Sequence, residues 1–195
     1  MTRGSLKLYD LHIVIAEANG FQSTLVQSML RGFGANIIHE TRSVAATMHL
    51  LRDRRIDILI CDAKLPTEGG FELTRRIRRD VESPNRIVPV FVMASDTREV
   101  TVNAARDAGA NMVIAKPMSP SALYDRLSWV ALRPRQFVDS GSYFGPDRRF
   151  KIEGYPNGVG RRSTDTPLEV ADDAGPALEQ TDIDSLFKAA REGRD

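Results

Sequence analysis

The chain has little of what secreted and membrane proteins depend on. Its 195 residues include a single cysteine, Cys61, which excludes an internal disulfide. No apolar run approaches the roughly 20 residues that a membrane-spanning helix needs. Residues 1–5 lack the apolar region of a signal peptide. These absences predict a cytoplasmic protein without a membrane partner.

An excess of one charge sign is also missing, because the formal net charge is +1. That total conceals two blocks. Residues 133–162 hold seven basic and three acidic side chains, whereas residues 165–187 hold seven acidic and no basic ones. A basic block followed by an acidic block is typical of an interaction tail. The acidic block and an isoelectric point of about 7.9 disfavour DNA or RNA as the partner.

Short apolar runs alternate with segments whose apolar residues recur at helical spacing over the first 130 residues. The runs predict five strands, near residues 11–15, 36–39, 56–61, 88–93 and 112–115. Five strands alternating with five helices predict an α/β fold, a doubly wound parallel sheet with helices on both faces. Right-handed crossovers would bring the ends of four strands to one edge, together with Glu17, Asp62, Ala94, Ser95 and Lys116.

The most informative stretch is an apolar strand that ends in an acid, Asp62. Ligands of open α/β sheets bind at the carboxyl ends of the strands. Leu65-Pro66 and Gly69-Gly70 follow in the loop after Asp62. Cys61 lies within the strand and is predicted to be a small core residue rather than a reactive thiol.

Together with Ala108-Gly109-Ala110 and Lys116-Pro117, these motifs resemble the receiver domain of two-component response regulators, which has a flavodoxin-like fold. The resemblance covers residues 8–132. It implies that Asp62 accepts a phosphoryl group from a histidine kinase or phosphotransfer protein. It further implies Mg²⁺ bound by Glu17, Asp62 and the backbone carbonyl of Lys64. Phosphate contacts are implied for Lys116 and Ser95, with Pro117 in a cis peptide bond.

Three positions depart from the pattern of that family. Ala16-Glu17 stands where two acidic residues are usual, Ala94 stands where a hydroxyl is usual, and Val113 replaces an aromatic residue. Fewer acidic oxygens predict weaker metal binding, and the missing hydroxyl predicts weaker coupling of phosphorylation to the fourth helix. Two interpretations stay open: Asp62 is phosphorylated but weakly coupled, or the receiver is a binding scaffold that needs no phosphorylation.

Residues 133–176 are rich in Gly, Pro, Ser, Asp and Arg, which predicts a largely disordered, flexible extension. A solvated basic linker is the simplest interpretation. Arginine, however, suits bidentate phosphate contacts and stacking on planar rings. The stretch 143–149 also resembles arginine-rich extensions of chemotaxis-regulator-like proteins that bind cyclic di-GMP and act on the flagellar motor. This resemblance implies nucleotide contacts from Arg133, Arg135, Tyr143, Arg148, Arg149, Arg161 and Arg162.

The last segment, residues 177–195, is predicted to form a short, acidic amphipathic helix. Its apolar stripe contains Ile183, Leu186 and Phe187. The segment resembles the peptide of the flagellar motor switch protein that docks on a chemotaxis receiver, so this stripe is a candidate partner surface. A nonspecific capping helix is the alternative.

The sequence thus predicts a stand-alone response regulator that is not an enzyme and acts through protein–protein contacts, in chemotaxis or flagellar motility. Residues 133–195 are not expected to form a DNA-binding or catalytic domain. The alternative is an adaptor receiver that is independent of phosphorylation and controlled by cyclic di-GMP bound to the tail.

Overall fold

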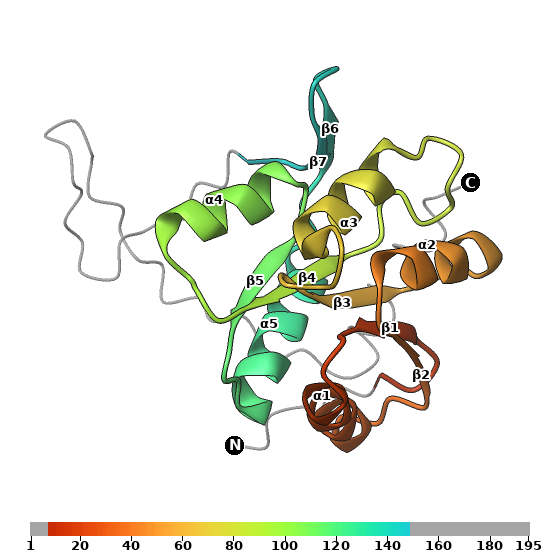
Figure 1. The fold of residues 1–195 in the computed structure, drawn as a ribbon, viewed down its shortest axis with the longest axis vertical. Helices are drawn as coiled ribbons and strands as arrows, with labels where there is room; N and C mark the ends of the chain where they lie inside the picture. Colours follow the sequence, from red (N-terminus) through yellow and green to blue (C-terminus); the bar gives the residue numbers. More distant parts are fainter. Residues whose placement is uncertain (1–7, 149–195) are drawn as a thin grey trace, which may run out of the picture.

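A computed structural model describes residues 8–148 (Figure 1). In chain order the elements are β1 His12–Ala16, α1 Gly20–Gly32, β2 Ile37–Thr41, α2 Val44–Asp53, β3 Ile58–Asp62, α3 Gly69–Arg79, β4 Val90–Ala94, α4 Glu99–Asp107, β5 Met112–Ala115, α5 Pro120–Leu132, β6 Phe137–Asp139 and β7 Phe144–Pro146. The predicted terminal helix, 177–195, lies outside the described residues. Within them, no helix is long and apolar enough to cross a membrane.

The five predicted strands form one parallel sheet in the order β2-β1-β3-β4-β5. This confirms the predicted doubly wound α/β fold. Because every strand runs the same way, the residues that follow β1, β3, β4 and β5 meet at one edge of the sheet. The strand boundaries differ from the predicted ones by at most two residues, and Asp62 is the last residue of β3.

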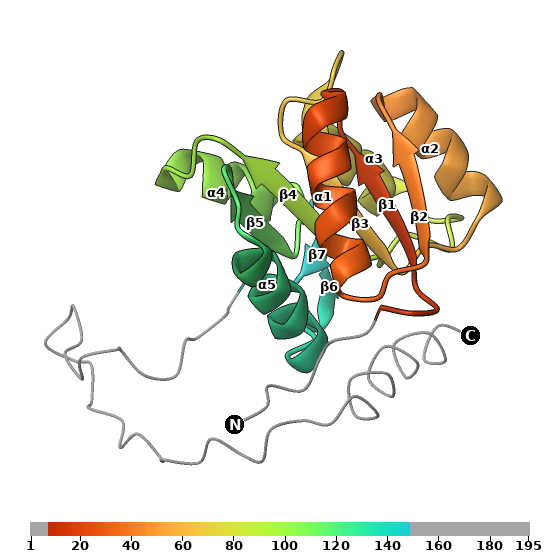
Figure 2. The same ribbon diagram turned by 90° about the horizontal axis from the view of Figure 1, so that it is seen from below.

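Alternate residues of each strand enter two separate cores. Ile13, Ile15, Ile58 and Ile60 pack with α1 and α5, whereas the intervening Val14, Leu59 and Cys61 pack with α2, α3 and α4. Figure 2 shows α1 and α5 together in front of the sheet. A strand buried on both faces reads as a continuous apolar run, which is why these strands are conspicuous in the sequence.

Side-chain caps set the start of three helices. Asn19, Ser43 and Ser119 precede α1, α2 and α5, and each side-chain oxygen accepts a hydrogen bond from a backbone N–H of the first turn. Such caps satisfy donors that would otherwise lack a partner. The Asn19 cap also fixes where α1 begins relative to the end of β1, and so helps to position the edge that carries Glu17.

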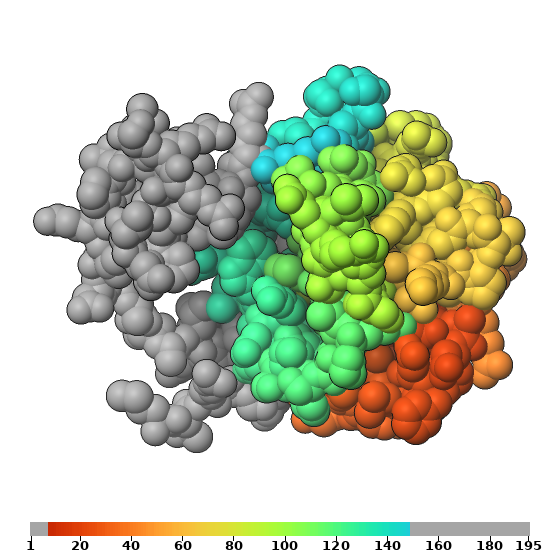
Figure 3. All heavy atoms as spheres, turned by 60° about the vertical axis from the view of Figure 1, so that its left-hand side comes forward, coloured from red at the N-terminus to blue at the C-terminus, as the bar shows by residue number. Residues whose placement is uncertain are grey.

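Residues 137–146 correct the expectation of a flexible chain over 133–176. They form an antiparallel hairpin, β6–β7, in which Phe137 pairs with Pro146 and Asp139 with Phe144. Figure 3 shows this hairpin, in cyan, lying against α4 (green) and α3 (yellow). Residues 149–176 of the predicted extension lie outside the described residues.

A buried arginine of α3, Arg78, anchors the hairpin. Its guanidinium donates to the carbonyl oxygens of Gly109, Arg86 and Val88 and to the side-chain oxygen of Asn111. The same group lies over the Phe137 ring, 4.9 Å from its centroid. Burying a charged group is costly unless hydrogen bonds compensate, so Arg78 holds α3, the start of β4 and the hairpin together.

A second arginine, Arg86, reinforces this contact from the loop before β4. Its guanidinium lies 3.5 Å from the centroid of the Phe144 ring and 3.6 Å from the Asp139 carboxylate. Stacking of arginine on aromatic faces is favourable and depends on tertiary placement. Local sequence patterns do not predict the hairpin, because Arg78 and Arg86 lie more than 50 residues before the residues that they contact in it.

Replacing Gly109 is expected to destabilise the fold. Its φ is +90°, and an added Cβ would lie 2.9 Å from Arg78 Cγ and 3.1 Å from the Phe144 carbonyl oxygen. We expect Gly109→Ala to cost roughly 1–2 kcal/mol for the left-handed backbone and a further 1–3 kcal/mol or so for overpacking, measured by urea unfolding.

Gly141→Ala is the matched control for that experiment. Its φ is +78°, but an added Cβ would meet nothing within 4 Å. Only the backbone cost should therefore appear. Equal losses in the two variants would contradict the close packing of the hairpin against Gly109.

Cys61 is expected to resist thiol reagents in the native protein. Burial, reinforced by the neighbouring Asp62 carboxylate, raises the pKa of the thiol from 9.0 to about 12. The reactive thiolate is therefore almost absent at pH 8. Absorbance with a disulfide reagent should show no native reaction and one equivalent after addition of denaturant. Rapid native labelling would contradict the buried position.

Candidate functional site

Three strands deliver charged side chains to the carboxyl edge of the sheet. Glu17 follows β1, Asp62 ends β3 and Lys116 follows β5. The register pairs Ala16 with Cys61, and the Lys116 N–H donates to the carbonyl oxygen of Ala94. Parallel pairing thus brings together groups that are up to 99 residues apart in the sequence.

Lys116 lies at the centre of this group. Its Nζ is 2.8 Å from Glu17 Oε2, 3.2 Å from Asp62 Oδ1 and 2.5 Å from Gln22 Oε1. The side chains of Glu17, Lys116 and Asp62 are only 2%, 13% and 16% exposed. Two carboxylates and one ammonium leave the cluster one negative charge in excess, in a setting where weak solvent screening strengthens each interaction.

Glu17 is held from both sides. Its Oε1 accepts a hydrogen bond from the Asn19 N–H at 2.9 Å, and its Oε2 accepts from Lys116. The backbone N–H of Glu17 donates to the Thr41 carbonyl oxygen. A buried carboxylate needs such compensation. The single acid after β1 is therefore fixed in orientation rather than free to turn toward solvent.

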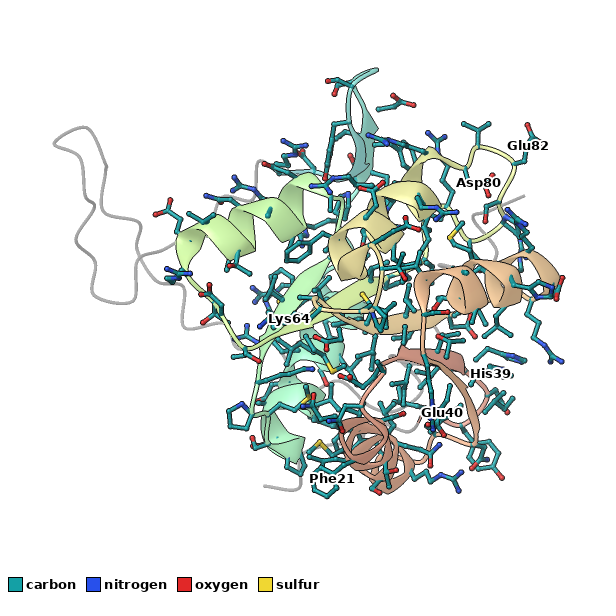
Figure 4. The ribbon with its side chains drawn as sticks, in the orientation of Figure 1. Phe21, His39, Glu40, Lys64, Asp80 and Glu82 are labelled. Atoms are coloured by element: carbon teal, nitrogen blue, oxygen red, sulfur yellow. The ribbon has the colours of Figure 1, made fainter. Side chains whose placement is uncertain are left out.

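The loop after β3 wraps closely around Asp62. The Lys64 N–H lies 3.2 Å from Asp62 Oδ1, and Figure 4 shows Lys64 on this loop, away from Asp80 and Glu82 beyond the far end of α3. A Cβ on Gly70 would lie only 2.3 Å from the Asp62 carbonyl oxygen. The glycine thus permits α3 to begin directly against the strand end.

The departures from the receiver pattern are visible in the geometry. Ala94 is buried at the end of β4 and presents a methyl group where a hydroxyl is usual. Ser95 is exposed, and its hydroxyl forms no hydrogen bond with the residues described. Lys116 therefore approaches Asp62 without a hydroxyl beside it. The Lys116–Pro117 peptide bond is cis, as the resemblance implies.

The oxygen atoms around Asp62 suit a hard cation. Glu17 and Asp62 bring two carboxylates to this edge, and the resemblance implies the backbone carbonyl of Lys64 as a further oxygen. Mg²⁺ takes oxygen ligands while keeping several waters. Over residues 8–148 no three His, Cys, Asp or Glu side chains gather into a metal cluster. The donor set thus fits Mg²⁺ but is small, and the Lys116 ammonium lies between the same two carboxylates.

The described residues predicted to contact a nucleotide lie elsewhere. The guanidinium of Arg135 donates to the Asn111 carbonyl oxygen. Arg148 lies 3.5 Å from the centroid of the Tyr143 ring and 3.0 Å from the Asp107 carboxylate. These contacts tie the hairpin to the amino end of β5 and the end of α4, opposite the Asp62 edge.

The remaining predicted tail residues divide into two groups. Arg133 is exposed directly after α5. Arg149, Arg161, Arg162, Ile183, Leu186 and Phe187 lie outside the described residues.

Gln22 and Asn19 belong to the site but were missed by sequence analysis. Asn19 carries a detectable signal, because an Asn before an amphipathic helix is a favoured cap. Gln22 carries none: a polar residue in the first turn of a helix usually faces solvent. Only its 2.5 Å contact with Lys116 reveals it.

Comparisons with known proteins agree with this geometry. The family model described as "Response regulator receiver domain" matches residues 13–128. Among curated relatives, the autoinducer 2 sensor kinase/phosphatase LuxQ of Vibrio parahaemolyticus is 27% identical over 61% of this chain and 14% of its own length. The transcriptional regulatory protein PdtaR of Mycobacterium tuberculosis is 28% identical over 65% of this chain and 59% of its own. The chain covers less than two thirds of the length of either relative.

Solved structures share the fold. The chemotaxis response regulator CheY4 of Vibrio cholerae aligns with a TM-score of 0.57 at 18% identity, over 62% of this chain and 98% of that one. The receiver domain of the sensor histidine kinase PA1611 from Pseudomonas aeruginosa, solved with a magnesium ion in its active-site cleft, aligns with a TM-score of 0.55 at 24% identity, over 62% and 97% of the two chains. The family model, the parallel sheet and the acid–lysine edge agree, and the chain belongs to the response regulator receiver domain family.

Proposed function

We propose that this protein is a stand-alone response regulator whose receiver accepts a phosphoryl group on Asp62 and acts through protein–protein contacts. The observation that carries the proposal is the position of Lys116 Nζ, 3.2 Å from Asp62 Oδ1 and 2.8 Å from Glu17 Oε2. A buried ammonium beside a strand-end carboxylate is suited to stabilise the charge of a transferred phosphoryl group.

Asp62 has one oxygen available for attack. Among the described residues, the contacts of the Asp62 carboxylate with the Lys64 N–H and with Lys116 both involve Oδ1, which leaves Oδ2 without a partner there. We infer that Oδ2 attacks the phosphorus of a kinase phosphohistidine. The new O–P bond forms as the P–N bond breaks, and the imidazole leaves with its electron pair. Lys116 then neutralises a phosphoryl oxygen.

Glu17, Asp62 and the Lys64 carbonyl are the residues that would hold Mg²⁺. Such an ion supplies neutralisation of charge on the reacting oxygens. Support comes from the oxygen-only donor set and from the magnesium ion that the PA1611 receiver contains. Asn19 assists by orienting Glu17 through its backbone N–H.

The proposed partners are a histidine kinase or phosphotransfer protein as donor and a protein target as output. Receiver domains typically serve as signalling modules for histidine kinases rather than as enzymes, and curated relatives such as LuxQ are sensor kinases. The proposal of an output in chemotaxis or flagellar motility rests on a sequence resemblance. The segment that contains Ile183, Leu186 and Phe187 resembles a peptide of the flagellar motor switch protein. The fold shared with CheY4 is compatible with that output.

Beryllofluoride tests the phosphorylation directly. With Mg²⁺ present, we expect the full chain to form an adduct with bound ¹⁹F signals and altered amide shifts around residue 62. Asp62→Asn, which removes the charge and keeps the shape, should abolish both. Asp96→Asn, at a carboxylate that pairs with the exposed Arg98, should leave them intact. Absence of any wild-type adduct, together with no labelling by acetyl phosphate, would refute the proposal in favour of the adaptor alternative.

Control by cyclic di-GMP stays a prediction from the sequence. Of the described members of the predicted set, Arg133 is exposed, whereas Arg135 and Arg148 already contact Asn111 and Asp107. If the tail binds this ligand, calorimetry on the full chain should show micromolar binding that weakens at least tenfold in Arg161→Ala/Arg162→Ala. Arg55→Ala, at an exposed arginine after α2, should not change it. No heat with the intact wild-type chain would contradict the prediction.

A further inference from the structure

We propose that Gln22 is a positioning residue that holds Lys116 away from Asp62 and thereby sets how readily the site stabilises a phosphoryl group. The inference rests on the proposed function of Asp62. It concerns a residue of α1 that no sequence motif indicates and that lies 94 positions before Lys116.

The ammonium of Lys116 already donates two hydrogen bonds on the α1 side of the site. Two of its three N–H groups donate to Glu17 Oε2 and Gln22 Oε1, whereas Asp62 Oδ1 lies at ion-pair distance, 3.2 Å from Nζ. Lys116 is therefore directed toward α1 before a phosphoryl group arrives. For Lys116 to turn fully toward a phosphoryl group on Asp62, the contact with Gln22 or Glu17 has to lengthen or break.

The three contacts are unequal. The distances to Gln22 and Glu17, on the β1–α1 side, are 2.5 and 2.8 Å, whereas the distance to Asp62 on β3 is 3.2 Å. Lys116 is thus drawn toward α1. Hydrogen bonds to a charged donor are stronger than neutral ones, so the uncharged Gln22 amide contributes to this bias alongside the Glu17 carboxylate.

Local structure keeps Gln22 in place. Its backbone N–H donates to the Asn19 side-chain oxygen at the helix cap, 3.1 Å away. Its neighbour Phe21 is 79% exposed and is labelled on α1 in Figure 4, so the first turn directs these two side chains differently. Because Asn19 also orients Glu17, one cap fixes both acceptors that draw Lys116 toward α1.

The position of Lys116 matters more here because the residue at the end of β4 is Ala94, whose methyl group cannot donate to a phosphoryl oxygen. Among the described residues of the cluster, Lys116 is the cationic side chain in contact with Asp62. A ligand shifts a conformational equilibrium only by its differential contacts. Whatever competes for Lys116 therefore lowers the stabilisation that the phosphoryl group receives.

Gln22→Leu tests this competition, because leucine has a similar volume and no acceptor. We expect the beryllofluoride concentration at half-saturation, at fixed Mg²⁺, to fall about fivefold, since Lys116 is released toward Asp62. Gln27→Leu is the matched control. It lies on the same helix and donates to Glu40 at 2.7 Å, away from the cluster, so its half-saturation should equal that of the wild type.

Gln22→Glu should have the opposite effect, because a third carboxylate binds Lys116 more strongly and repels the phosphoryl mimic. The ¹⁹F resonance of the fluorine nearest Lys116 should shift in opposite directions in the two Gln22 variants, a signature that a loss of helix stability would not produce. An adduct in the wild type with unchanged or weaker binding in Gln22→Leu would overturn the role of Gln22. Absence of a wild-type adduct would instead overturn the proposed function of Asp62.

Discussion

The ion-pair cluster around the Lys116 ammonium is the constraint on which the functional edge depends. Glu17 is 2% exposed and Asp62 16%, and a buried carboxylate without a counter-charge would be costly. Lys116 provides that charge to both and reaches them because β1, β3 and β5 are parallel and end at the same edge. The arrangement is also responsive, since a ligand that draws Lys116 toward Asp62 competes with the hydrogen bonds from Lys116 to Glu17 and Gln22.

At the opposite edge of the sheet, arginine side chains stack on aromatic rings and donate hydrogen bonds to oxygen atoms. Arg78 joins α3 to Gly109 and Asn111, and Arg86 lies over Phe144 of the hairpin. These contacts make β6–β7 part of the folded unit, although it lies beyond the residues that the family model matches. Of the arginines predicted to bind a nucleotide, Arg135 contacts Asn111 and Arg148 contacts Asp107 at this edge, away from the acid–lysine cluster.

Much of the fold could be predicted from local patterns. Strands buried on both faces read as continuous apolar runs, and caps such as Asn19 and Ser43 mark helix starts. The convergence of Glu17, Asp62 and Lys116 followed from strand order alone, because parallel strands expose their carboxyl ends together. The hairpin and Gln22 did not follow, because Phe144 and Gln22 acquire their roles from Arg86 and Lys116, far away in the chain.

The sequence by itself determined the sheet, the acid at its edge and the two alanines that set this receiver apart, because periodicity and residue type are local properties. Tertiary structure alone decided which groups accept hydrogen bonds from Lys116 and which groups Arg135 and Arg148 contact. Hydrogen bonds and cation–π contacts depend on distances of a few ångströms between residues remote in sequence. No local pattern encodes such distances.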